Sequence, residues 1–136
     1  MTDTVRAAQY FKMKISNKAG QGVGVLASLS KAKVNLLAFS GFPLKQRAQL
    51  DFVPSDPAAF KAAARKAKLK VRGPKTCFLV EGDDRPGAGA GLMAKLADAR
   101  INVTSLQAVS AGAGRYGAIL WVKPGDVKKA AKALGI

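Results

Sequence analysis

An internal repeat is the feature of this sequence that most constrains its fold. With Gly20 aligned to Gly87, an offset of 67 residues (87 − 20), seven positions are identical. These pairs are Gly20 and Gly87, Gly22 and Gly89, Gly24 and Gly91, Ala27 and Ala94, Leu29 and Leu96, Ala32 and Ala99, and Asn35 and Asn102. The offset then grows to 70 residues (124 − 54) where Pro54 pairs with Pro124, so the second copy carries a loop three residues longer (70 − 67). Matches at a fixed period indicate that one supersecondary unit is written twice.

Both copies predict the same succession of strands and helices. Strands rich in aromatic and β-branched residues are expected over 10–15 and 76–81, from 34 and 101 onward, and over 47–53 and 116–122. Helices with an apolar stripe follow the first strand of each copy, and Val23 and Met93 belong to these stripes. Second helices are expected over 57–69 and 127–134, capped by Asp56 and Asp126. A last strand is clear at 70–71 and almost absent at 135–136.

Hairpin turns are expected at Gly41–Pro43 and Ala111–Gly114. The resulting order, strand-helix-strand-strand-helix-strand, is typical of a ferredoxin-like sandwich. We therefore predict an α+β protein of two such repeats, residues 1–73 and 74–136. Each repeat has an antiparallel four-stranded sheet with both helices on one face.

Missing residue types exclude most catalytic chemistry. The chain has no histidine and a single cysteine, Cys77, so the usual transition-metal sites and His-dependent triads are excluded. Only Asp83 and Asp84 are clustered among the 8 acidic residues, and adjacent carboxylates rarely converge on one bond. Cys77 lies in an apolar strand and is expected to be buried. We predict no enzyme activity, no metal and no cofactor.

One motif in the second copy points to a known family. Asp84-Arg85-Pro86-Gly87 follows the first strand, and Ala99-Arg100-Ile101-Asn102-Val103 follows the helix. This pattern resembles the ACT domain, a family of amino-acid-sensing modules. The first copy matches more weakly, with Asn17-Lys18-Ala19-Gly20 and Lys33-Val34-Asn35-Leu36. The resemblance covers essentially the whole chain, and its nearest likeness is to stand-alone tandem ACT proteins with no attached enzyme.

The resemblance implies a ligand site at the loop after the first strand. The ligand contacts that it implies are Asp84, Arg85, Gly87, Gly89 and Asn102, and by the repeat Asn17 and Asn35. The chemistry agrees, because a glycine-rich loop that opens a helix offers backbone N–H groups to a carboxylate. In this arrangement Asp84 accepts from the ligand ammonium and Asn102 arrives beside the loop. In the alternative interpretation, the glycines serve tight helix–sheet packing and the asparagines merely stop the helix.

Charge offers a rival function. The formal net charge is +15, and residues 1–73 hold 14 basic and 3 acidic side chains, which gives +11. Lys61, Arg65, Lys68 and Arg72 form a basic stripe along and beyond the second helix. RNA-recognition modules share this strand order, so nucleic-acid binding is the alternative to amino-acid sensing. Tyr116 and Trp121 argue against it, because residues five apart in a strand point to opposite faces.

Strand patterning suggests an assembly. Both sheet faces of the second copy are apolar, so the face away from the helices needs cover, either by the other repeat or by a second subunit. We expect a homodimer with Trp121 near the contact. The charged residues Asp3 and Arg6 lie in the first segment of the chain, which has no apolar core like that of a secretory signal. No apolar run in the sequence reaches the length of a membrane helix. We therefore expect a cytoplasmic protein that senses a free amino acid or similar metabolite and regulates a protein not identified by the sequence.

Overall fold

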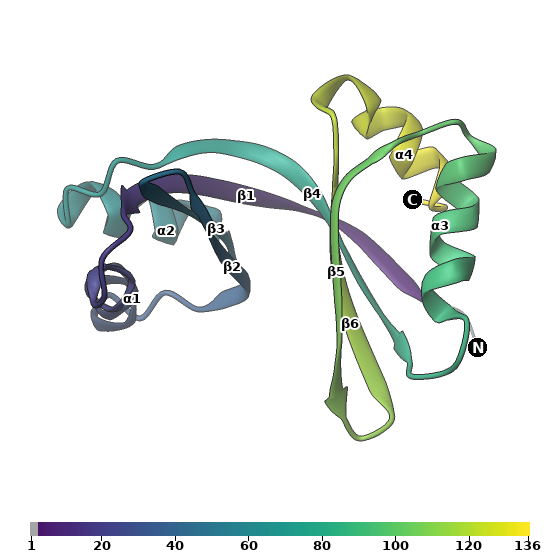
Figure 1. Cartoon of the computed structure of the whole chain (residues 1–136), viewed down its shortest axis with the longest axis horizontal. Coiled ribbons are helices and arrows are strands. Elements are labelled where there is room, and N and C mark those ends of the chain that lie inside the picture. The colour runs from purple at the N-terminus through teal and green to yellow at the C-terminus, as the bar shows by residue number, and fades with distance from the viewer. Residues whose placement is uncertain (1–2) are drawn as a thin grey trace. The chain divides into compact units, whose positions relative to one another are not determined.

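The structure, a computed structural model, describes residues 3–136; the first two residues of the predicted first repeat lie outside this range. Its elements are β1 (Thr4–Ser16), α1 (Gln21–Lys31), β2 (Leu36–Leu44), β3 (Arg47–Pro54), α2 (Pro57–Lys66), β4 (Arg72–Asp83), α3 (Ala88–Asp98), β5 (Val103–Gly112), β6 (Arg115–Val122), the 3-10 turn η1 (Pro124–Asp126) and α4 (Val127–Ala133). Figure 1 shows their course. The predicted α+β class of two ferredoxin-like repeats is confirmed.

Two compact units divide the described chain. The first unit is Gln9–Lys75, and the second unit is Thr76–Ile136 with residues 3–8. These limits differ from the predicted repeats, 1–73 and 74–136, at the beginning of the chain and by two residues at the junction. The strand order is β2-β3-β1-β4 in the first unit and β1-β4-β6-β5 in the second. Both β1 and β4 contribute residues to each unit.

The start of β1 occupies the position where the last strand of the second copy was expected. Residues 135–136, where the last strand of the second copy was expected, form no strand. Their backbone amides close α4 instead: Gly135 N donates to Lys132 O at 3.1 Å and Ile136 N to Ala131 O at 2.9 Å. In the second unit the position beside β4 is filled by residues 4–8 of β1. The expected strand at 70–71 likewise begins later, at Arg72, and continues as β4.

The first unit packs α1 and α2 against its sheet. Its buried cluster is Phe11, Val25, Leu29, Leu50, Phe52, Phe60 and Ala64. Phe11 and Phe52 are register partners in the antiparallel β1–β3 pair, so their rings meet the helices from neighbouring strands. Val23, predicted in the buried stripe of α1, is 70% exposed, because Val25 and Leu29 take the inward positions four residues apart.

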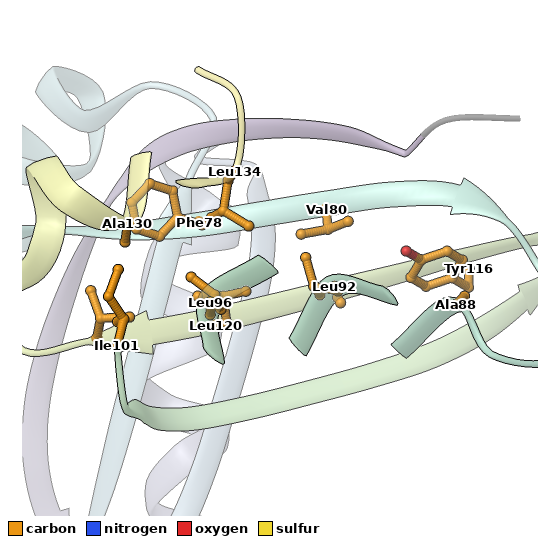
Figure 2. Close-up of a cluster of buried hydrophobic side chains, with 12 residues drawn as sticks. Phe78, Val80, Ala88, Leu92, Leu96, Ile101, Tyr116, Leu120, Ala130 and Leu134 are labelled. Carbon is orange, nitrogen blue, oxygen red and sulfur yellow. The ribbon is translucent and has the colours of Figure 1, made fainter. Parts of the chain in front are cut away.

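The second unit packs α3 and α4 on the same face of its sheet (Figure 2). The inward residues of α3 are Ala88, Leu92 and Leu96, one every four residues. They meet Phe78 and Val80 from β4 and Leu120 from β6, and α4 adds Ala130 and Leu134. Met93, predicted in this stripe, is 39% exposed because it lies one position beyond Leu92 on the helix.

Trp121 and Cys77 do not belong to the helix-facing cluster, yet both are buried within the single chain, at 8% and 0% exposure. The predicted burial of Cys77 is confirmed. Cover for Trp121 was expected from the other repeat or from a second subunit; its side chain is withdrawn from solvent within one chain, so its burial is evidence neither for nor against the predicted homodimer. Any dimer must therefore be argued from other residues.

Two local predictions are wrong and two are confirmed. The Asp56 carboxylate caps α2, accepting from Ala58 N at 3.1 Å and Ala59 N at 3.2 Å, whereas Asp126 makes no side-chain cap. The second hairpin turns at 113–114, within the predicted segment. The first turns at 45–46, because Gly41–Pro43 pairs with β3 as part of β2. A side chain on Gly41 would press on Leu50, with its Cβ 3.0 Å from Leu50 Cδ2, so this glycine serves close packing within the sheet.

Candidate functional site

The loop between β4 and α3 opens the helix without a side-chain cap. Gly87 is the N-cap residue, with φ 84° and ψ 0°, a left-handed conformation that favours glycine. Among residues 3–136, no side chain caps the start of α3 by a hydrogen bond. A Cβ placed on Gly87 or Gly89 would meet nothing within 4 Å, so neither glycine is required by tight packing. The packing interpretation of these glycines is therefore wrong, and the first turn of α3 is open to an approaching group.

Arg85 forms a fork with a residue far away in the sequence. Its Nη1 donates to Asp3 Oδ1 at 3.0 Å and its Nη2 to Asp3 Oδ2 at 3.4 Å. Nη1 also donates to the backbone oxygen of Asp83 at 2.8 Å, which holds the guanidinium against its own loop. The hydrogen bond from Arg85 lowers the pKa of Asp3, although burial opposes it. The same contact raises the pKa of Arg85.

Tyr116, at the start of β6, lies next to Ala88 of α3 (Figure 2). Its hydroxyl is buried and makes no hydrogen bond of good geometry with the described residues. Burial raises the pKa of Tyr116, and the nearby Asp3 carboxylate raises it further. Gly82 makes room for this pair, because a Cβ there would collide with the Asp3 carboxylate and come within 3.0 Å of the Tyr116 ring.

The β5–β6 hairpin also contacts the loop between β4 and α3. Ser110 Oγ donates to Asp84 Oδ2 at 3.0 Å, and Asp84 N donates to Gly114 O at 2.8 Å. Arg115 pairs with Asp83 at 2.9 Å. Asp84 itself has no cationic partner among residues 3–136, so its carboxylate keeps an unneutralised charge beside the loop.

Asn102 does not face this loop within its own unit. It lies three residues beyond Ala99, the C-cap of α3 (102 − 99), whereas Asp84 and Gly87 precede the helix. Eleven helical residues span about 16 Å, so the two ends are well separated. The end of β5 that reaches the loop carries Ser110, not Asn102.

The first unit repeats the arrangement with weaker chemistry. Gly20 is a left-handed N-cap with φ 89° and no side-chain cap, and exposed Asn17 precedes it. Asn35 lies beyond the other end of α1, where its backbone oxygen accepts from Ser55 N at 3.0 Å and Ser55 Oγ at 3.3 Å. An open depression of about 510 Å³ surrounds it, lined by Leu26, Leu29, Ser30, Lys33, Val34, Asn35 and Leu36.

Sequence reasoning missed Asp3, Ser110, Arg115 and Tyr116. Strand alternation could have placed Tyr116 on the helix-facing side, with Ala118 and Leu120, but not its unpaired hydroxyl. Asp3 carries no signal, because it precedes the first predicted strand. No cluster of metal-ligating residues occurs among the described residues, and no helix in that part of the chain is long and apolar enough to cross a membrane.

Comparison with solved structures supports the fold. A Bacteroides thetaiotaomicron protein, BT0572, superposes with a TM-score of 0.82 at 18% identity, covering 96% of this chain and 88% of that one. The ligand-free regulatory subunit of aspartate kinase from Thermus thermophilus gives 0.63 at 16% identity, covering 97% and 93%. The Thermus flavus regulatory subunit gives 0.62 at 16% identity, covering 98% and 95%. No family model and no curated protein matches the chain.

Proposed function

We propose that this chain is a non-catalytic regulatory protein that binds a free amino acid, or a similar small metabolite, at the loop before α3. The observation that carries the proposal is the uncapped start of α3 at Gly87, which follows directly after the Arg85 guanidinium and the Asp84 carboxylate, whose hydrogen-bond partner, Ser110, is neutral. Both charged ends of an amino acid find a partner there. Structural likeness to regulatory subunits of aspartate kinase is consistent with a regulatory role.

The ligand groups are assigned by charge. The carboxylate approaches the start of α3, where Gly89 leaves the backbone uncovered, and the Arg85 guanidinium. The ammonium approaches Asp84, whose carboxylate has a neutral partner, Ser110. The first unit offers Asn17 in place of an acidic residue, so its loop binds an ammonium more weakly.

Asn102 contributes to this site only from a second copy of the chain. The proposed homodimer has support at β2, the end strand of the first unit. Its large apolar side chains Leu37, Phe39, Phe42 and Leu44 are 41–43% exposed. An end strand with apolar side chains and open backbone groups favours pairing with another chain.

A thermal-shift screen against the common L-amino acids tests the proposal, because a ligand that binds only the folded state raises the melting temperature. We expect at least one amino acid to stabilise the wild-type protein and Asp84→Ala to lose that stabilisation. Asp98→Ala is the matched control, since Asp98 is also exposed, carries the same charge and lies at the far end of α3. Stabilisation that survives in Asp84→Ala would place the site elsewhere.

Nucleic-acid binding is the second candidate, favoured by the net charge of +15 and by Lys61, Arg65, Lys68 and Arg72, all of which are exposed. A gel shift with mixed-sequence RNA across a salt series tests it. Phosphate binding by these residues would weaken steeply as salt rises. Tight binding at physiological salt that is lost when the four residues are replaced by glutamine would favour this candidate over amino-acid sensing.

A further inference from the structure

The guanidinium of Arg85 already holds a carboxylate, and that carboxylate belongs to the protein. Asp3 accepts from both terminal nitrogens of Arg85, at 3.0 and 3.4 Å, although the two residues are 82 positions apart. The Asp3 side chain is 10% exposed, while Arg85 is 36% exposed and remains reachable from solvent. A fork of two parallel N–H donors is the geometry by which arginine recognises carboxylates.

The groups around the Asp3 carboxylate also suit a ligand carboxylate. Gly82 lacks the Cβ that would fill the space around the Asp3 carboxylate. Tyr116, 8% exposed, brings a buried hydroxyl that lies near the Asp3 carboxylate but makes no hydrogen bond of good geometry with the described residues. Lys95 of α3 adds a positive charge close enough to act on Asp3. Arg85, Gly82, Tyr116 and Lys95 thus all lie near the Asp3 carboxylate, an arrangement that a surface ion pair would not require.

We propose that Asp3 is a tethered occupant of the carboxylate-binding part of the ligand site, and that a ligand carboxylate binds Arg85 and Tyr116 by displacing it. This inference rests on the proposed function. The ligand class that it names is a free α-amino acid with an unblocked carboxylate. Because Asp3 immediately precedes β1, displacement also releases the side-chain anchor of the strand segment 4–8, which completes the second unit. Ligand binding and attachment of the first strand therefore oppose each other.

Competition of this kind makes a specific prediction for Asp3→Asn. An internal competitor lowers the apparent affinity by the fraction of molecules in which the site is free, so its removal tightens binding. Calorimetry with the strongest amino acid of the screen should show roughly 10-fold tighter binding for Asp3→Asn. The methyl ester of that amino acid, which lacks the carboxylate charge, should gain nothing. Asp98→Asn makes the same charge change at a distant exposed position and should bind like the wild type.

A second measurement reports on Asp3 directly. Carboxyl carbon NMR of the wild-type protein follows the titration of Asp3 with and without saturating amino acid. Displacement removes the Arg85 hydrogen bonds that lower the pKa of Asp3. The pKa of Asp3 should therefore move back toward its ordinary value when the ligand is bound. A merely structural ion pair would keep its titration unchanged.

The outcomes separate the two proposals. If Asp3→Asn binds no more tightly than the wild type, or if the ester gains equally, the displacement proposal is wrong. In that case, loss of binding in Arg85→Gln and Asp84→Ala would still support the proposed ligand site. If no amino acid binds the wild-type protein or Asp3→Asn, both proposals are wrong. Binding by Asp3→Asn alone would be the strongest support, because it would reveal a site that the tether closes.

Discussion

The rings of Phe11 and Phe60 stack with centroids 4.7 Å apart and an interplanar angle of 28°. They join β1 to α2, and both side chains are withdrawn from solvent, at 1% and 0% exposure. Phe60→Ala should destabilise the protein by about 3–5 kcal/mol, because it removes buried surface and leaves a cavity. Urea denaturation measures this loss. Phe39→Ala, at a position 41% exposed, should cost less than half as much; equal losses would contradict this account of the core.

The two expected helix caps give a matched pair of variants. Asp56 accepts from two amides at the start of α2, so Asp56→Ala should lower the free energy of unfolding by about 1 kcal/mol. Asp126 accepts from no amide of α4, and Asp126→Ala should change stability by much less. Thermal denaturation followed by circular dichroism compares them. Similar losses would mean that both carboxylates act through charge alone.

Asp51 provides a pH-dependent prediction. Its carboxylate, 6% exposed, accepts from Gln49 Nε2 at 3.1 Å and Ser40 Oγ at 3.4 Å. Burial nevertheless raises the pKa of Asp51 above its ordinary value. A raised pKa in the folded state means that the group stabilises the fold below its unfolded pKa and loses that contribution as pH rises through the folded pKa. Asp51→Asn should therefore be more stable than the wild type at pH 7.

The advantage of Asp51→Asn should shrink as pH falls through the raised folded pKa and be lost well below the ordinary aspartate value of about 4, where the wild-type carboxyl is protonated in both states. Guanidinium denaturation of both proteins at pH 7 and pH 3 measures the change. An Asp51→Asn protein less stable at pH 7 would show that the two hydrogen bonds outweigh the cost of burying the charge.

Asp3 should show the opposite pH dependence. Its folded pKa is lowered, first by the Arg85 hydrogen bond. A lowered folded pKa means that the contribution is present above the unfolded pKa and is lost as pH falls through the folded pKa. Asp3→Asn should be less stable than the wild type at pH 7, by a modest amount because Arg85 is partly exposed. The difference should shrink as pH falls through the lowered folded pKa of Asp3, and a difference that does not shrink would assign it to packing.

How much the sequence predicts depends on the kind of feature. The repeat at an offset of 67 residues located α1 and α3 correctly, because glycine loops and four-residue apolar spacing are local signals. The use of residues 4–8 as a strand of the second unit carries no such signal. Residues 135–136, where the last strand was expected, close α4 instead. Pairings between distant segments are decided by tertiary structure.

The candidate site shows the same limit. The Asp84–Gly87 motif predicted an uncapped helix start, which the structure has. The resemblance placed Asn102 beside the loop, but the two are not adjacent in space, since α3 separates Asn102 from the loop. The prediction that Val23 and Met93 belong to the buried stripes is wrong, because an apolar side chain next to a buried stripe fits the same sequence pattern. Only the packed structure distinguishes them.

The last prediction asks whether Asn102 completes the ligand site from a second copy. Losing one hydrogen bond to a charged ligand group costs about 1.5 to 3 kcal/mol, or roughly 10- to 150-fold in affinity. Asp84→Ala and Asn102→Ala should each weaken binding by this factor in a homodimer. Because Asn102 cannot reach the loop of its own unit, the two losses should complement each other when the variants are unfolded, mixed and refolded together. A mixed dimer pairs an intact loop from one copy with an intact Asn102 from the other, so about a quarter of all sites should regain wild-type affinity under random pairing. Calorimetry of the mixture, with each variant alone as control and size-exclusion chromatography to verify the dimer, measures the recovered fraction. Wild-type affinity in Asn102→Ala alone, or no recovery in the mixture, would show that the site lies within one copy and that Asn102 does not contact the ligand.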